Sequence, residues 1–284
     1  MTTSQNRTLL QIAKSYFVSV IASWIAKSYH LTQIARNVVR IYDNDGNSNM
    51  YTNGEFRLLS LLVANSREGV FFDVGANRGD WSAEALALDF LGRLVAVDPL
   101  PRNIEAIKRR FSGRSNVTPL QYALSDTIGD LEFFSNWDEK ESGTDSLFDM
   151  NRIGYAPNVT AVKVRCTTLP SIMGQLGLPK IDFLKIDVEG NEYFVLRGAH
   201  PLLAQELIDF IQIEYGHAAR AAKVYLHDIV NLVKKYPYDI FVIKPRGLLP
   251  LNFTPFVENR YSMINLLIVR RAVLSELRLN ILCR

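Results

Sequence analysis

The sequence predicts an α/β protein built on an open, mostly parallel sheet with helices on both faces, and three observations predict it. Short apolar runs alternate with helical patterns between about residues 69 and 245. A glycine turn follows the first run, and acidic residues follow several runs at the point where each ends. An alternation of this kind is typical of strands that are connected by crossover helices.

The first apolar run, Gly69 to Val74, is short and rich in β-prone residues, so a buried strand suits it better than a helix. Gly75 and Gly79 bracket the turn that follows, and without side chains they let a ligand approach the backbone closely. A helical pattern begins after Gly79, and the N-terminus of such a helix carries positive charge density. The segment therefore predicts a strand, a binding turn and a helix.

A carboxylate closes the next run at Asp98, which lies 98 − 79 = 19 residues beyond Gly79. An acidic residue about 20 residues after such a turn binds the ribose hydroxyls in nucleotide-binding α/β units. In dinucleotide-binding turns a middle glycine admits a pyrophosphate, but here Asn77 takes that place. We therefore expect an adenosine without phosphates and with a charged amino-acid tail, which describes S-adenosylmethionine.

Polar residues recur where later runs end. Tyr122 to Asp126 closes a third run, and Ile181 to Gly190 closes a fourth. Ligands of open α/β sheets bind outside the carboxyl ends of the strands, so we expect Asp73, Asp98, Asp126 and Asp187 to converge on one crevice. For Ser125 or Asp187 taken singly, the N-cap of a helix is an equally good interpretation.

Several motifs of this chain resemble those of the FkbM family of S-adenosylmethionine-dependent methyltransferases. They are Asp73-Val-Gly-Ala-Asn-Arg-Gly79, Val97-Asp98-Pro99, Ala123-Leu-Ser-Asp126 and, most specific, Phe183-Leu-Lys-Ile-Asp-Val-Glu-Gly-Asn-Glu192. The similarity spans about residues 69 to 245. It implies a class I methyltransferase fold, a Rossmann-like sheet of seven strands, of which six are parallel and one near an edge is antiparallel.

The resemblance also implies roles for individual residues. Asp98 would bind the ribose, and Ser125 and Asp126 would lie beside the adenine. The methionine end of the cofactor would be lined by Asp73, Gly75, Asn77 and Gly79.

Methyl transfer to a hydroxyl requires alignment and a base that removes the hydroxyl proton. We expect this base after the fourth and fifth runs, in the cluster of Asp187, Glu189, Glu192, Glu214 and His217. His217 has the pKa best suited to accept a proton near neutrality, and Glu189 is the alternative. Asp187, Glu189 and Glu214 carry the oxygen ligands that Mg²⁺ or Ca²⁺ prefers, but nothing fixes their geometry, so we assign no metal site.

The predicted activity is O-methylation of a hydroxyl on a sugar, a glycolipid or a related metabolite, with S-adenosylmethionine as the cofactor. One alternative is a nicotinamide-dependent oxidoreductase, which Asn77 and the absence of a Tyr-x-x-x-Lys pair disfavour. The other is a noncatalytic binding protein that kept the fold, although the residues of the cofactor motif are all present.

Composition agrees with an enzyme of ordinary charge. The formal net charge of +3 and the pI near 8.8 indicate no nucleic-acid-binding surface, and a basic run around Lys108 to Arg110 suits an exposed helix face. With only Cys166 and Cys283, the chain has no disulfide framework or zinc motif, which favours a cytoplasmic location.

We divide the chain into an N-terminal helical section, residues 1–66, and a cofactor-binding domain, residues 67–284. Residues 8–27 form an apolar helix with a narrow polar stripe, which Lys14 makes too short to span a membrane. This helix either packs against the domain or a second subunit of a homodimer, or lies on a membrane as a peripheral contact.

Three segments complete the prediction. Asn136 to Pro157 is a polar loop that either contacts the acceptor or is a solvent-exposed hairpin. Phe241 to Ile243 and Ser262 to Val269 are strands separated by the irregular stretch Pro245 to Pro255, and Arg270 to Arg284 is a short amphipathic helix.

Overall fold

The computed structural model of the chain describes residues 3–136, 145–149, 159–251, 263–275 and 281–282. These residues divide into two compact units, Met1–Asp45 and Gly46–Arg284. The division falls inside the predicted helical section, because helices α3 (Met50–Asn53) and α4 (Glu55–Asn65) belong to the larger unit.

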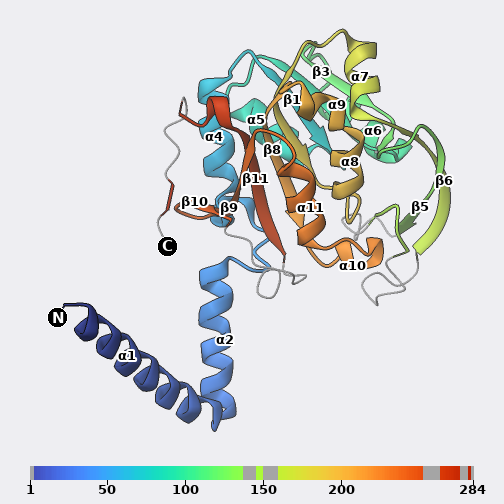
Figure 1. The fold of residues 1–284 in the computed structure, drawn as a ribbon. Helices are drawn as coiled ribbons and strands as arrows, with labels where there is room; N and C mark the ends of the chain where they lie inside the picture. Colours follow the sequence, from blue (N-terminus) through green and yellow to red (C-terminus); the bar gives the residue numbers. More distant parts are fainter. Residues whose placement is uncertain (1–2, 137–144, 150–158, 252–262, 276–280, 283–284) are drawn as a thin grey trace. The chain divides into compact units, whose positions relative to one another are not determined.

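The larger unit contains an eight-stranded sheet in the order β10-β9-β11-β8-β7-β1-β2-β3 (Figure 1). Its strands are β1 (Val70–Val74), β2 (Arg93–Val97), β3 (Val117–Leu120), β7 (Ile181–Ile186), β8 (Ile208–Tyr215), β9 (Tyr238–Lys244), β10 (Gly247–Pro250) and β11 (Ile264–Arg270). The pairs from β3 to β8 are parallel, whereas β11 runs antiparallel to both β8 and β9.

The predicted fold class is confirmed, but the predicted count of seven strands is wrong. The eighth strand, β10, forms an antiparallel hairpin with β9 inside the stretch Pro245 to Pro255, which we expected to be irregular. This strand is only four residues long and contains Gly247 and Pro250, so its composition indicates a turn. Its edge position tolerates that composition because one side needs no ladder partner.

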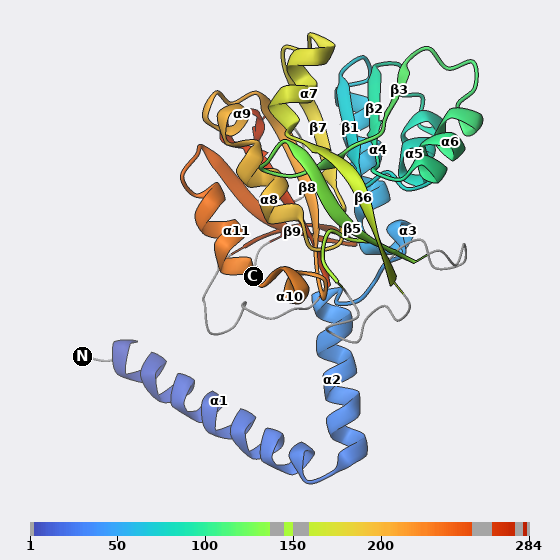
Figure 2. The same cartoon turned by 90° about the vertical axis from the view of Figure 1, so that its right-hand side faces the viewer.

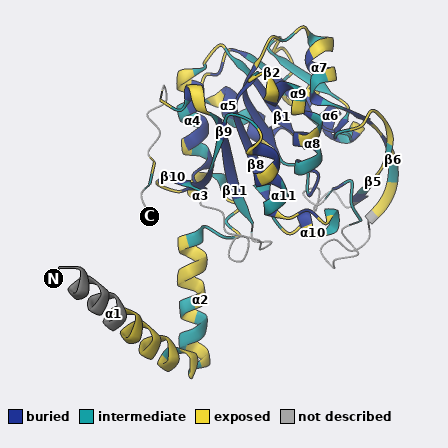
Figure 3. Cartoon of the chain, in the orientation of Figure 1, coloured by how far each residue is buried: buried dark blue, intermediate teal, exposed yellow. Residues whose placement is uncertain are grey.

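Both faces of the sheet are buried, as alternating residues of each central strand show. Phe71 of β1 and Phe183 of β7 face a cluster under α4, α5 (Asp80–Ala87) and α6 (Pro101–Arg110). Phe72 and Leu184 face the opposite cluster, which lies under other helices. These helices are α7 (Leu169–Leu176), α8 (Glu192–Gly198), α9 (His200–Ala204) and α11 (Leu226–Val233). Figure 3 shows the central strands coloured as buried between the helices. A sheet buried on both faces explains why its strands are near-continuous apolar runs.

A second, three-stranded sheet leaves the main fold after β3. It has the order β4-β6-β5, with β4 (Ala123–Leu124), β5 (Gly129–Asn136) and β6 (Val159–Thr167). Figure 2 shows the long antiparallel hairpin of β5 and β6. The third predicted run is therefore split between two sheets. Most of the predicted loop Asn136 to Pro157 lies outside the described residues.

The segment after β11 differs from the predicted amphipathic helix. Its first residues form the 3₁₀ helix η3 (Arg271–Val273), and Ile281 makes an isolated bridge to Leu248. Residues 276–280 and 283–284 of the predicted helix lie outside the described residues. Among the described residues of this stretch, Arg270 is the last residue of β11 and Ile281 pairs with β10. These residues therefore do not form one continuous helix.

The smaller unit contains two helices, α1 (Thr3–Ala26) and α2 (Tyr29–Asp43). Ser28 is the N-cap of α2, and its side chain accepts a hydrogen bond from the Leu31 N–H at 3.4 Å. The Thr32 hydroxyl donates to the Ile25 carbonyl at 3.2 Å, which ties the start of α2 to the end of α1. Of the helices that the structure describes, none combines the length and apolar character needed to cross a bilayer.

Candidate active site

A crevice lies at the carboxyl ends of β1, β2 and β7, where a ligand is expected in an open α/β sheet. Residues that follow each of these strands contribute to its walls. They include Gly75, Asn77, Asp98, Leu100, Asn103, Tyr122, Leu124, Phe133, Asp145, Leu147, Asp187, Glu189 and Asn191. We call this crevice the cofactor pocket, because predicted cofactor-binding residues line it. Its lining combines polar side chains with the apolar Leu100, Phe133 and Leu147.

The turn after β1 lies close to a neighbouring strand end, whereas the two glycines were expected to admit a ligand. Gly75, Asn77 and Gly79 have φ values of 80°, 48° and 79°, in the left-handed region. A Cβ added to Gly75 would overlap the carbonyl oxygen of Asp187 on the neighbouring strand end. Backbone N–H groups of Gly75 and Ala76 donate to the Val97 carbonyl at 2.9 and 3.0 Å, which fixes the turn against β2.

Asp98 is nearly completely buried at the end of β2 and faces the cofactor pocket. Its Oδ1 accepts hydrogen bonds from the Leu100 N–H and the Asn103 side chain, both at 2.9 Å, and its Oδ2 accepts one from the Asn77 N–H at 3.0 Å. Burial raises the pKa of Asp98 to about 7, although these hydrogen bonds favour the charged form. Asn103, in the first turn of α6, was not singled out in the sequence.

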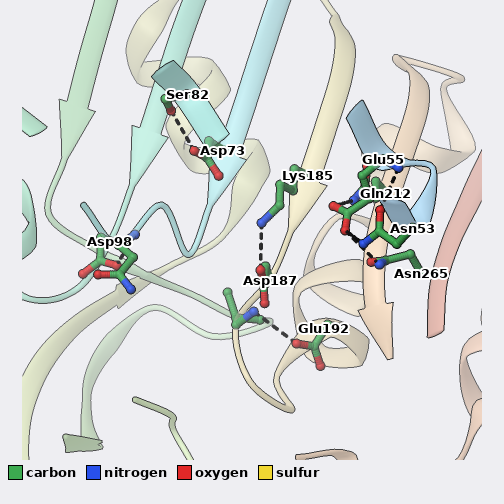
Figure 4. A network of polar contacts seen from close by, with 12 residues as sticks. Asn53, Glu55, Asp73, Ser82, Asp98, Lys185, Asp187, Glu192, Gln212 and Asn265 are labelled. Carbon is green, nitrogen blue, oxygen red and sulfur yellow. Dashed lines mark hydrogen bonds and ion pairs between the residues drawn. The ribbon is translucent and has the colours of Figure 1, made fainter. Parts of the chain in front are cut away.

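Asp73 is fully buried on β1 and does not line the pocket. The Ser82 hydroxyl donates to its Oδ2 at 2.7 Å, whereas its buried Oδ1 has no hydrogen-bond partner among the described atoms (Figure 4). Burial raises the pKa of this carboxyl, and the charge of Lys185 opposes that effect. Of the four aspartates expected to converge, Asp98 and Asp187 therefore line the crevice and Asp73 lies behind it.

The loop expected beside the adenine lies at the crevice through Tyr122, Ala123 and Leu124 rather than through Ser125 or Asp126. Asp126 forms an ion pair with Arg197 of α8, and the Ser125 hydroxyl donates to Asp126 at 3.3 Å. The Asn191 amide donates to the Leu124 carbonyl at 2.6 Å and thereby holds this loop. The roles of Ser125 and Asp126 toward an adenine stay predictions.

A second, smaller cavity opens beside the cofactor pocket and is lined mainly by acidic residues. It brings together the five members of the predicted cluster, Asp187, Glu189, Glu192, Glu214 and His217, with Met263 from the segment before β11. Asp187 and Glu189 line both cavities, so they connect them. We call this second cavity the carboxylate cavity.

Three glutamates of the carboxylate cavity have raised pKa values. Burial raises the pKa of Glu214 to about 8, with a further increase from the charge of Asp187. Burial, followed by the charges of Asp187 and Glu214, raises the pKa of Glu189 well above its ordinary value. Burial also raises the pKa of Glu192 to about 7, although the N–H groups of Gly190 and Val188 donate to this carboxyl. Raised pKa values in a cleft are typical of groups that exchange protons.

Lys185 is the cation buried among these acids, and the sequence analysis did not assign it a role. Its Nζ lies 2.8 Å from Asp187 Oδ2 (Figure 4). Burial would lower the pKa of Lys185, but the charges of Asp187, Asp73 and Glu55 raise it above its ordinary value. A lysine in the middle of an otherwise apolar strand is the signal that could have identified it, because such a residue needs buried partners.

Glu55 was also missed, because it begins α4 more than 100 residues before its partners. Its carboxylate accepts hydrogen bonds from Gln212 of β8 at 2.5 Å and from Asn265 of β11 at 2.9 Å, and from Asn53 (Figure 4). This buried network joins α4 to two strands of the sheet. Its charge also contributes to the raised pKa of Glu214.

Asp145 and Leu147 of the segment Asp145 to Asp149 line the cofactor pocket. Asp145 forms an ion pair with Arg102 of α6 at 2.7 Å, and the buried Ser146 donates from its hydroxyl to the Glu189 carbonyl at 2.5 Å. Ser146 also pairs with Phe134 of β5 through two backbone hydrogen bonds. Part of the polar loop predicted from Asn136 to Pro157 thus contacts the cofactor pocket and Glu189, the alternative base of the sequence analysis.

No three His, Cys, Asp or Glu side chains among the described residues form a group that could hold a metal ion. In the carboxylate cavity this agrees with the geometry, because Lys185 is paired with Asp187 and Glu192 accepts backbone hydrogen bonds.

The fold and this pair of cavities define a methyltransferase-type α/β domain. The protein family described as "Methyltransferase FkbM domain" matches residues 73–240 of this chain, and this chain belongs to that family. The family predicted from the sequence is thereby confirmed. The match also supports S-adenosylmethionine as the cofactor.

Individual relatives are more distant. The hexuronic acid methyltransferase AglP of Haloferax volcanii is 24% identical over 163 residues, which cover 57% of this chain and 62% of that protein. This chain thus spans less than two thirds of the relative's length.

Two solved structures show similarity at low identity. A methyltransferase FkbM from Methylobacillus flagellatus KT has 16% identity and a TM-score of 0.46, covering 72% of this chain and 44% of that one. An O-methyltransferase from Bacillus cereus has 10% identity and a TM-score of 0.39, covering 76% and 80%.

Proposed function

We propose that this protein transfers a methyl group from S-adenosylmethionine to an oxygen atom of a saccharide. The observation that carries the proposal is that the cofactor pocket and the carboxylate cavity share Asp187 and Glu189 as walls. A bound adenosine and a proton-accepting carboxylate would then lie on two sides of the loop that contains Asp187 and Glu189. Alignment and proton removal are the two contributions that methylation of a hydroxyl demands of a protein.

The residues of the cofactor pocket fit an adenosine with an amino-acid tail. Asp98 presents a carboxylate to two ribose hydroxyls, and Leu100, Phe133 and Leu147 provide apolar contacts for a base. Gly75 and Asn77 of the turn line the pocket, so they are placed to contact the tail. When bound, the cofactor supplies a methyl group that is already activated on a sulfonium.

We assign the role of general base to Glu189. It borders both cavities, and its raised pKa makes its carboxylate a stronger base than an ordinary glutamate. Asp187 is less suited because Lys185 pairs with it and stabilises its charged form. Glu214 and His217 line only the carboxylate cavity and are the competing candidates.

An acidic saccharide is the acceptor class that the neighbouring surface favours. A hollow that shares Leu147 with the cofactor pocket is lined by Phe134, Phe148, Arg220 and Lys223. Aromatic side chains give a sugar ring an apolar surface, and the two exposed cations would bind a carboxylate or phosphate on it. The name of the Haloferax volcanii relative, a hexuronic acid methyltransferase, agrees with this class.

Calorimetric titration with S-adenosylmethionine, S-adenosylhomocysteine and NAD tests the cofactor assignment. Binding of the first two without NAD is the expected result. Binding of NAD alone would restore the oxidoreductase alternative, and binding of none of them would favour a noncatalytic protein.

Methyl transfer from labelled S-adenosylmethionine to neutral and uronic-acid glycans tests the base and the acceptor. Glu189→Gln should lower turnover roughly 100-fold or more and leave cofactor affinity unchanged. The exposed Glu132→Gln on β5 is the matched control. If Glu214→Gln or His217→Asn shows the larger loss instead, the base is reassigned to that residue.

Arg220→Gln and Lys223→Gln should raise KM about tenfold for the acidic glycan and leave KM for a neutral one unchanged. Lys235→Gln, on an exposed site after α11, is the control. Equal effects on both glycans would contradict recognition of an acidic group.

A further inference from the structure

Helix α2 of the smaller unit carries an apolar face that α1 leaves exposed. Ile34, Val38, Ile41 and Tyr42 follow a helical spacing, and they are 58%, 61%, 79% and 70% exposed. Residues at i, i+4, i+7 and i+8 lie on one side of a helix. Leaving such a stripe in water is unfavourable, so the face is built to contact another surface.

Helix α1 adds exposed apolar residues of the kind that occupy a membrane–water boundary. Tyr16, Phe17 and Trp24 are exposed, and Ile21 is partly so. Ser19 belongs to the polar stripe of α1, and its hydroxyl donates to the Tyr16 carbonyl at 2.7 Å. This hydroxyl therefore does not need water as a hydrogen-bond acceptor. Aromatic residues with one polar atom are enriched at the headgroup level of bilayers.

The charge of the smaller unit indicates which kind of surface it binds. Residues 3–42 contain no Asp or Glu, and they carry five cations, Arg7, Lys14, Lys27, Arg36 and Arg40. The four of these whose side chains the structure describes, Lys14 and those after it, are exposed. An anionic surface is complementary to this pattern, whereas a second copy would bring five like charges against the first five.

From this pattern we infer that helices α1 and α2 bind the protein to a bilayer that contains anionic phospholipid. The apolar face of α2 and the aromatic residues of α1 enter the headgroup boundary. The cations remain at the level of the phosphates, which their long side chains reach from the polar face. Neither step depends on the proposed transfer reaction.

Flotation of the full chain with vesicles tests the inference. One set of vesicles is pure phosphatidylcholine, and the other contains about 30% phosphatidylglycerol. The expected result is at least tenfold tighter binding to the anionic set. Replacing Lys14 and Lys27, which lie on either side of the aromatic residues of α1 in the sequence, together by Gln should weaken that binding by roughly fivefold for each cation removed.

Val38→Asp places a charge on the apolar face and should reduce vesicle binding at least tenfold. Gln33→Asp is the matched control, because it adds the same charge on the same helix, five residues and about 140° away around the axis. The control should bind vesicles with less than a threefold loss. Affinity for S-adenosylhomocysteine verifies that both variants keep the larger unit intact.

Two results would overturn the inference. One is equal loss of vesicle binding in Val38→Asp and Gln33→Asp, which would deny a role to the apolar face. The other is a stable dimer in sedimentation velocity that Val38→Asp dissociates, without any vesicle binding by the unmodified chain. In that case the apolar face binds a second copy.

Discussion

At the scale of single residues, Asp98 makes cofactor binding depend on pH. Ribose hydroxyls donate to a charged carboxylate, but the pKa of Asp98 is about 7 before a ligand is bound. Below that pH the group must first lose its proton, so affinity for S-adenosylhomocysteine should fall about tenfold for each pH unit. Calorimetry between pH 5 and pH 8 measures this slope. Asp98→Asn should bind weakly, with no comparable slope, and an equal slope in that variant would refute the assignment.

Glu192 makes stability depend on pH with the opposite sign from an ordinary ion-paired carboxylate. The pKa of the Glu192 carboxyl is 4.5 in an ordinary glutamate, the reference for the unfolded chain, and about 7 in the folded chain. Between these two pH values the folded chain holds a proton that the unfolded chain releases. The free energy of unfolding therefore falls as pH rises through this window, by about 3 kcal/mol at most for this group.

Glu192→Gln should remove that contribution, because a neutral amide oxygen can still accept the N–H groups of Val188 and Gly190. Urea unfolding at pH 5 and pH 8 measures it. We expect a variant that is more stable than the unmodified protein at pH 8 and similar to it at pH 5. A steeper loss of stability at high pH in the variant would contradict the raised pKa.

Sequence reasoning identified residues whose role is local and missed those whose partners are distant. Gly75 and Asp98 were identified because each occurs at a fixed distance from an apolar run. Glu55 was missed because its partners lie on other elements, as in the contact between Glu55 and Asn265, 210 residues apart. Lys185 was missed because its burial near Asp73 and Glu55, and not its spacing from Asp187, sets it apart. Only the folded sheet brings these groups together.

At the scale of elements, the segment Asp145 to Asp149 lines the cofactor pocket and contacts Glu189, which borders both cavities. Ser146 holds the carbonyl of Glu189, a residue with a φ of 49° that lies in the left-handed region. Ser146→Ala should release that carbonyl and let the Glu189 side chain move. We expect kcat to fall about tenfold while affinity for S-adenosylmethionine is preserved.

Steady-state kinetics combined with calorimetry separates these two effects for Ser146→Ala. Ser135→Ala is a useful comparison, because this buried serine of β5 instead accepts a hydrogen bond from Arg102. If Ser146→Ala changes cofactor affinity and turnover together, the segment acts on the pocket as a whole and not through Glu189.

Elements were predictable where a strand is long and apolar. β1, β2, β7 and β8 were identified from such runs, whereas β4 has only two residues and β10 only four. Strands this short have no periodicity of their own, and pairing with β6 or β9 defines them. The count of seven strands failed for this reason.

At the scale of the whole molecule, the two units should separate in their stability. The hydrophobic clusters of the larger unit contain no residue before Met50. Deletion of residues 1–45 should therefore shift the melting temperature by no more than about 4 °C. Deletion of residues 1–66, the boundary predicted from the sequence, should prevent folding because it removes Glu55, Leu58, Leu59 and Leu62 from the core. Scanning calorimetry of both truncated chains measures the difference.

The boundary between the units lies in the polar stretch Asp43 to Asn49, whereas the sequence analysis placed it after α4, at residue 66. Helix α4 is as helical in pattern as α1 and α2, and only its burial against Phe71 and Phe210 assigns it to the larger unit. The covering of both sheet faces was predictable, since it follows from strands that are apolar on both sides.

The position of β11 has a consequence for how the protein is made. This strand, the latest in sequence among those described, lies between β8 and β9. A growing chain therefore exposes the unpaired edge of β8 until residue 270 has left the ribosome, and an open edge is a template for association with other chains. Chains interrupted before β11 should accumulate as aggregates, and synthesis should depend on chaperones that hold the incomplete sheet apart from its neighbours.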